Sequence, residues 1–112
     1  MKIRGKDIDL KITNALKFKL FAGGATAGDL LATDGASIEN YARAWAIVLD
    51  ESLKMPDLPA GEGAAVEAVK TERRKAAEAF VDSLPDVFEL NEYVCDVYAR
   101  DLGAPEDKKK AE

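Results

Sequence analysis

The first 21 residues change their apolar period from two to about 3.6, and this change constrains the fold most. Apolar and polar side chains alternate along residues 7–13, as in a strand with one buried face. Gly5-Lys6 lies just before this run, and glycine tolerates the positive φ that a two-residue hairpin turn needs. After Asn14, a predicted N-cap, apolar residues recur at helical spacing until a pair of glycines. The sequence therefore predicts a β-hairpin over residues 1–13 that leads directly into a short helix.

Residues 37–53 carry the most regular helical pattern in the chain. Ser37 is the predicted N-cap, and Glu39 and Arg43 form a favourable pair four residues apart. We expect Trp45 to be the largest buried side chain of this helix. The apolar stripe, at the spacing i, i+3, i+4, i+7, consists of Ile38, Tyr41, Ala42, Trp45, Val48, Leu49 and Leu53.

Further helices are predicted over residues 64–84 and 87–102, and a short one around Leu30-Leu31. Pro85 separates the two long helices, because the residue before a proline is disfavoured in the helical region; Ser83 is then the predicted cap of the last helix. The prolines and glycines of residues 54–63 indicate a loop. The fold class that follows is mainly α: a small helical bundle of four to five helices with a short N-terminal β-hairpin. We expect one helical domain over residues 1–103 and a disordered tail at 104–112.

Composition restricts the possible partners. The net charge of −5 and the pI of about 4.8 argue against nucleic acid or an anionic membrane. Residues 1–20 hold six Lys/Arg and two Asp, a net +4, so the rest of the chain carries −9. This asymmetry suits head-to-tail association through the hairpin, and a solvated basic face is the alternative. Cys95, the single cysteine, leaves no intrachain disulfide, as in a reducing cytoplasm. No signal peptide or membrane span is expected.

The residues of known reaction types are missing or misplaced. The chain has no histidine, which excludes Ser-His and Cys-His nucleophilic sites and His-ligated metals. The glycine-rich stretch at 23–28 is followed by Asp29, where a phosphate loop needs lysine. Three carboxylates, Glu89, Glu92 and Asp96, share one side of the last helix, either as a cation site or as a solvated face. We expect no catalytic residue, cofactor or metal, and therefore a protein that is not an enzyme.

The order of elements resembles the tail assembly chaperones of long-tailed bacteriophages. The resemblance covers about the first 20 residues and the general architecture of a hairpin, a small helix and an acidic helical body. Openings of the form I-x-G-K-x-x-x-L-K-x-T, followed shortly by A-L, are familiar in that family. The matching residues here are Ile3, Gly5, Lys6, Leu10, Lys11, Thr13, Ala15 and Leu16.

The resemblance implies a non-enzymatic chaperone that binds and solubilises the tape measure protein and helps recruit tail tube subunits. It implies that the protein functions in the host bacterial cytoplasm and is absent from the mature virion. It also implies a frameshifted longer product near the lysines at 108–110. Two alternatives remain: a structural virion or head-tail completion adaptor protein, and a small acidic regulatory or inhibitor protein.

A partner of this kind would need an apolar surface. The candidate is a groove beside the 54–63 loop in which an amphipathic helix would lie. The alternative is that these residues only close the core. The predicted groove residues are Leu16, Phe18, Phe21, Leu30 and Leu31.

Overall fold

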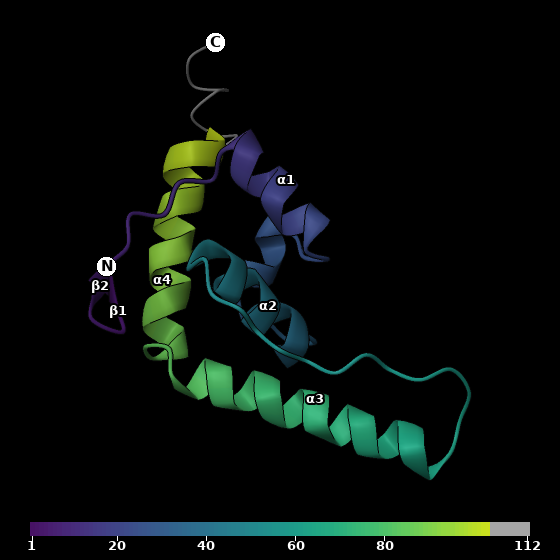
Figure 1. The fold of residues 1–112 in the computed structure, drawn as a ribbon. Coiled ribbons are helices and arrows are strands. Elements are labelled where there is room, and N and C mark those ends of the chain that lie inside the picture. Colours follow the sequence, from purple (N-terminus) through teal and green to yellow (C-terminus); the bar gives the residue numbers. More distant parts are fainter. Residues whose placement is uncertain (104–112) are drawn as a thin grey trace.

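The computed structural model describes residues 1–103 and has the expected mainly α architecture (Figure 1). Four α-helices follow a short antiparallel hairpin, with a 3-10 turn after the first helix and a π-helical turn after the last. The tail predicted at 104–112 lies outside the described residues. The elements are β1 (Lys2–Ile3), β2 (Lys6–Asp7), α1 (Asn14–Ala22), η1 (Ala27–Leu30), α2 (Ile38–Val48), α3 (Ala64–Asp82), α4 (Val87–Tyr98) and η2 (Ala99–Gly103).

Helix α2 is the centre of the packing. Helices α1 and η1 and the long α3 all contact it, and the N-terminal segment runs along α4 (Figure 1). As predicted, Ser37 caps α2, with its hydroxyl accepting the Asn40 N–H at 3.3 Å. Trp45 is fully buried, and its indole N–H donates to the carbonyl oxygen of Leu30 at 3.3 Å. The buried cluster also contains Ile3, Leu10, Ile12, Leu20, Ala25, Leu30, Tyr41, Ala44, Leu49, Leu84, Leu90, Val94 and Val97.

Two details of α2 differ from the expectation. The helix ends at Val48, and Asp50 has a positive φ of 54°, which turns the chain away before residue 53. Glu39 pairs with Arg73 of α3 at 3.0 Å, whereas the expected partner, Arg43, donates to Asn40. The contact with Arg73 joins two helices, so it depends on the tertiary fold and not on spacing within one helix.

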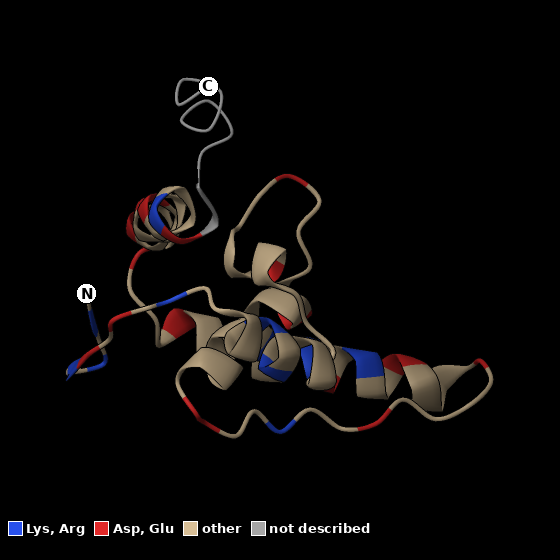
Figure 2. Cartoon of the chain, turned by 90° about the horizontal axis from the view of Figure 1, so that it is seen from above, with Lys and Arg blue, Asp and Glu red and all other residues tan. Residues whose placement is uncertain are grey.

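The long loop and α3 lie close to where the sequence predicts them. Residues 52–59 hold no regular structure, and Arg73 fastens the loop to α3 by donating to the carbonyl oxygen of Pro56 at 2.7 Å. Basic and acidic side chains are interspersed along α3 (Figure 2), as expected for an exposed charged face.

Two of the three predicted helix caps, those of α1 and α4, lie one to three residues from their predicted positions. Thr13, not Asn14, caps α1, because its hydroxyl accepts the Leu16 N–H at 3.1 Å. Asp86, not Ser83, caps α4 by accepting the Phe88 N–H at 2.8 Å, so Pro85 precedes that helix. Aspartate is a strong N-cap, and its position immediately before Val87 suits this role.

The hairpin is shorter than predicted, and its turn is shifted by one residue. Lys2 pairs with Asp7 and Ile3 with Lys6, so the turn is Arg4-Gly5. Both turn residues have positive φ, 50° and 82°, as a tight hairpin turn requires. Arg4, the non-glycine residue of the turn, has a side chain that forms an ion pair with Glu51, and its Cζ lies 5.2 Å from the centre of the Phe80 ring.

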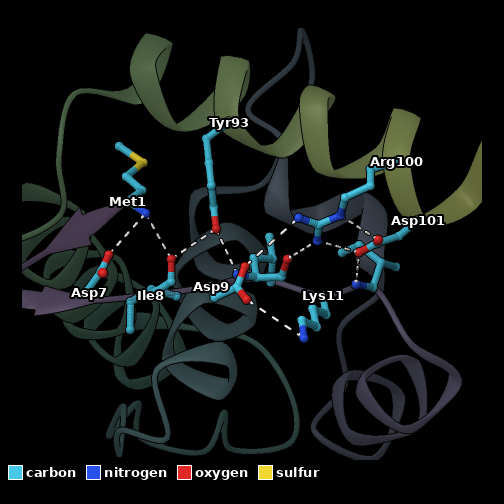
Figure 3. A network of polar contacts seen from close by, with 10 residues as sticks. Met1, Asp7, Ile8, Asp9, Lys11, Tyr93, Arg100 and Asp101 are labelled. Carbon is cyan, nitrogen blue, oxygen red and sulfur yellow. Dashed lines mark hydrogen bonds and ion pairs between the residues drawn. The ribbon is translucent and has the colours of Figure 1, made fainter.

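Residues 8–13, here called the N-terminal strap, follow β2 and contain no strand. The Ile8 N–H still donates to the Met1 carbonyl at 2.8 Å, and beyond Ile8 the strap pairs with no strand of the described chain. The predicted alternation is confirmed, since Leu10 and Ile12 are buried and Ile8 is half-buried. In place of a partner strand, the side chains of Tyr93, Arg100 and Asp101 form hydrogen bonds with the backbone of the strap (Figure 3). The Tyr93 hydroxyl accepts the Leu10 N–H at 2.7 Å and donates to the Ile8 carbonyl at 3.0 Å.

The far end of the strap is held by two charged residues of η2. Arg100 donates to the Leu10 carbonyl at 2.6 Å, and Asp101 accepts the Ile12 N–H at 2.8 Å (Figure 3). Hydrogen bonds from Arg100 and from Ile12 lower the pKa of Asp101 to about 2.

We expect this end of the strap to loosen in acid. A carboxyl whose folded pKa is lowered stabilises the fold above its unfolded pKa near 4 and loses that contribution as the pH falls through about 2. The amide chemical shift of Ile12, followed by NMR between about pH 5 and pH 1, should therefore titrate with Asp101. The D101A variant should remove this titration. An Ile12 amide that is insensitive to pH in the wild-type protein would contradict the contact.

Candidate functional site

An open apolar groove with a volume of about 630 Å³ lies between α1 and the turn that follows it. Two aromatic residues, Phe18 and Phe21, line this groove, and 77% and 76% of their surfaces are exposed. Exposed aromatic side chains grouped in a concave surface are typical of protein-binding sites. The lining residues are Lys17, Phe18, Phe21, Ala25, Thr26, Ala27 and Gly28.

Helix α1 exposes these rings because its opposite side is already used. Leu20 is fully buried and Leu16 is half-buried against the core. Residues three or four apart share a side of a helix, which places Phe18 and Phe21 together. A helix of nine residues thus carries apolar side chains on both its inner and outer sides.

The second wall of the groove forms because the chain reverses directly after α1. Gly24 has a positive φ of 82°, a conformation that glycine adopts without steric cost. The Ala25 N–H then donates to the Leu20 carbonyl at 2.8 Å, which fixes the reversal. The Thr26 N–H donates to the Asp29 carboxylate at 2.8 Å and closes the η1 turn.

Neighbouring helices hold this wall in place. The Tyr98 hydroxyl of α4 donates to the carbonyl oxygen of Ala27, and burial raises the pKa of Tyr98. Asn91 of α4 exchanges two hydrogen bonds with the backbone of Ala32, at 3.0 and 2.8 Å. Gly23 packs so closely on α2 that a Cβ there would lie 2.4 Å from Ile47 Cδ1. Contacts from α2 and α4 therefore fix the backbone beside the groove to the core.

The structure divides the five predicted groove residues into two groups. Phe18 and Phe21 line the groove. Leu30, the last residue of η1, is fully buried, and Leu16 and Leu31 are half-buried against the core. The loop at 54–63 contributes no lining residue. Lys17 and the backbone-rich wall at 25–28 were missed, although the glycine pair directly after the phenylalanines was a signal that the chain folds back there.

A second hollow lies on the outer side of α4. Its lining is more polar and consists of Phe88, Asn91, Glu92, Cys95 and Asp96. Phe88 is 76% exposed, and Cys95 is also exposed. This side of α4 offers one aromatic ring among carboxylates, a weaker apolar surface than the groove on α1.

Other classes of site are not visible in the part of the chain that the structure describes. Within residues 1–103, no three or more His, Cys, Asp or Glu side chains gather closely enough to hold a metal ion. The same residues contain no helix that is both long and apolar enough to cross a membrane. The lining of the groove offers mainly apolar contact, with Lys17 as its one charged side chain.

Comparison with known proteins adds no family to this description. The chain matches no protein-family model, no curated protein and no solved structure.

Proposed function

We propose that this protein is a non-enzymatic binding protein whose groove on α1 holds an apolar helical segment of a client. The exposed pair Phe18 and Phe21, which line an open apolar groove, carries the proposal. Shielding such a segment from water would keep an aggregation-prone client soluble.

The client that we propose is a phage tape measure protein, so the protein would act as a tail assembly chaperone in the host cytoplasm. The opening from Ile3 to Leu16 supports this choice through its resemblance to that family. Tail tube subunits and a second copy of the chain are further proposed partners. The exposed Lys2 and Lys6 keep the hairpin available for a contact between copies.

Co-expression with a long phage tape measure protein tests the proposal. We expect the client to be soluble with the wild-type chain and insoluble with the double variant F18S/F21S, which removes the apolar anchors without touching the core. The matched control is F88S, because Phe88 is exposed to the same extent on the outer side of α4. Near-equal thermal stability of the three proteins would show that the comparison reports binding.

Two results would overturn the proposal. One is a client that is no more soluble with the wild-type chain than without it. The other is equal loss of solubility with F18S/F21S and with F88S, which would remove the groove from the account. Detection of the chain in purified particles would instead favour the alternative of a virion component.

A further inference from the structure

The groove carries a single charge, and this charge is positive. Of its seven lining residues, Lys17 alone is ionised at neutral pH. It precedes Phe18 and lies one helical turn before Phe21, so its side chain lines the groove next to the aromatic anchors.

Lys17 also differs from its basic neighbours in having no acidic partner among residues 1–103. Lys19 is paired with Asp50, and Lys11 lies 3.8 Å from Asp9. The closest carboxylate of the far wall, Asp29, accepts the Thr26 N–H of its own turn and does not line the groove. The charge of Lys17 is therefore free to meet a charge on whatever occupies the groove.

We propose that the groove selects amphipathic helices whose apolar anchors are flanked by carboxylates. This inference rests on the proposed function, because it specifies the helix that the groove holds. The apolar anchors at i, i+3, i+4 and i+7 lie on Phe18 and Phe21, and a glutamate or aspartate beside them pairs with Lys17. Complementary charges at the rim of an interface contribute selectivity and orientation more than affinity.

The overall charge of the protein makes the inference easy to separate from a general attraction. The chain carries −5, so long-range electrostatics alone would favour a basic peptide. A preference for an acidic peptide must therefore come from positive charge near the groove, in residues 1–20, and not from the net charge of the chain.

The experiment uses two labelled synthetic helices of about 18 residues, roughly 27 Å long, with identical apolar anchors. One carries glutamate beside the anchors and the other carries lysine. Fluorescence anisotropy with the full chain at low salt should show the acidic peptide binding about two- to five-fold more tightly, the range of an exposed ion pair. The difference should shrink in high salt.

Charge reversal supplies the decisive comparison. K17E should reverse the preference, whereas K75E, the same change at an exposed position of α3 outside the groove, should leave it intact. Equal effects of the two variants would overturn the inference, because they would trace the preference to net charge.

The remaining outcomes separate this inference from the proposed function. If both peptides bind equally and F18S/F21S abolishes both, the groove binds helices but does not select by charge, and only the inference fails. If neither peptide binds the wild-type chain, both proposals fail. A chain that self-associates without peptide and is dispersed by F18S/F21S would show that a second copy fills the groove, and would overturn the acidic-helix assignment.

Discussion

Replacing Trp45 with alanine is expected to lower the free energy of unfolding by about 3–5 kcal/mol. The indole is fully buried, and it belongs to α2, the helix that α1, η1 and α3 all contact. Truncation leaves a cavity and also removes the donor to the Leu30 carbonyl. A loss of this size is a large share of the stability of a small domain.

Chemical denaturation with a tertiary-structure probe such as near-UV circular dichroism measures the effect. F88A is the matched control, since it also removes an aromatic ring but from a side chain that is 76% exposed. We expect its effect to stay within about 0.5 kcal/mol. Comparable losses in the two variants would mean that Trp45 is not the centre of the core.

Helical periodicity predicted α2 well because a buried stripe requires only that one side of a helix face the core. Tyr41, Ala42, Trp45 and Leu49, all from the predicted stripe, are buried. The ends of helices were less predictable, because Thr13 and Asn14 are both good caps and the choice depends on which hydroxyl or amide reaches the first turn.

The strap shows a different limit of sequence reasoning. Alternation indicated which of its residues are buried, but not what covers them. Its hydrogen-bond partners, Tyr93, Arg100 and Asp101, lie more than 80 residues away along the chain. Side chains of a helix that form hydrogen bonds with the backbone of an extended segment leave no periodic pattern in the sequence. For this reason the sequence predicts a longer hairpin than the structure contains.

The groove was predicted in part for a related reason. The sequence places five apolar residues in and after the first helix, but it does not say which side of that helix faces α2. The close contact of Gly23 with Ile47 and the burial of Leu20 decide the side. Phe18 and Phe21 are exposed as a consequence, and Leu30 enters the core.

A second large effect is expected at the strap, where L10A should cost about 2–5 kcal/mol. Leu10 is buried against the core although it belongs to a segment without strand pairing. Its backbone is bound at both polar groups, the N–H by Tyr93 and the carbonyl by Arg100. The truncated side chain would leave a cavity that the fixed backbone cannot close.

The neighbouring residue provides the control, because successive side chains of an extended segment point to opposite sides. Lys11 is exposed, so K11A should change the free energy of unfolding by no more than about 0.5 kcal/mol. The free energies of unfolding of L10A and K11A, measured with a denaturant, then show which residues of the strap face the core. If K11A were the more damaging substitution, the strap would have to be shifted by one residue, which would move its whole apolar set to the solvent side. Equal and small effects would mean that residues 8–13 do not pack on the core at all, and the hydrogen bonds of Tyr93 and Arg100 to the strap would be contradicted with them.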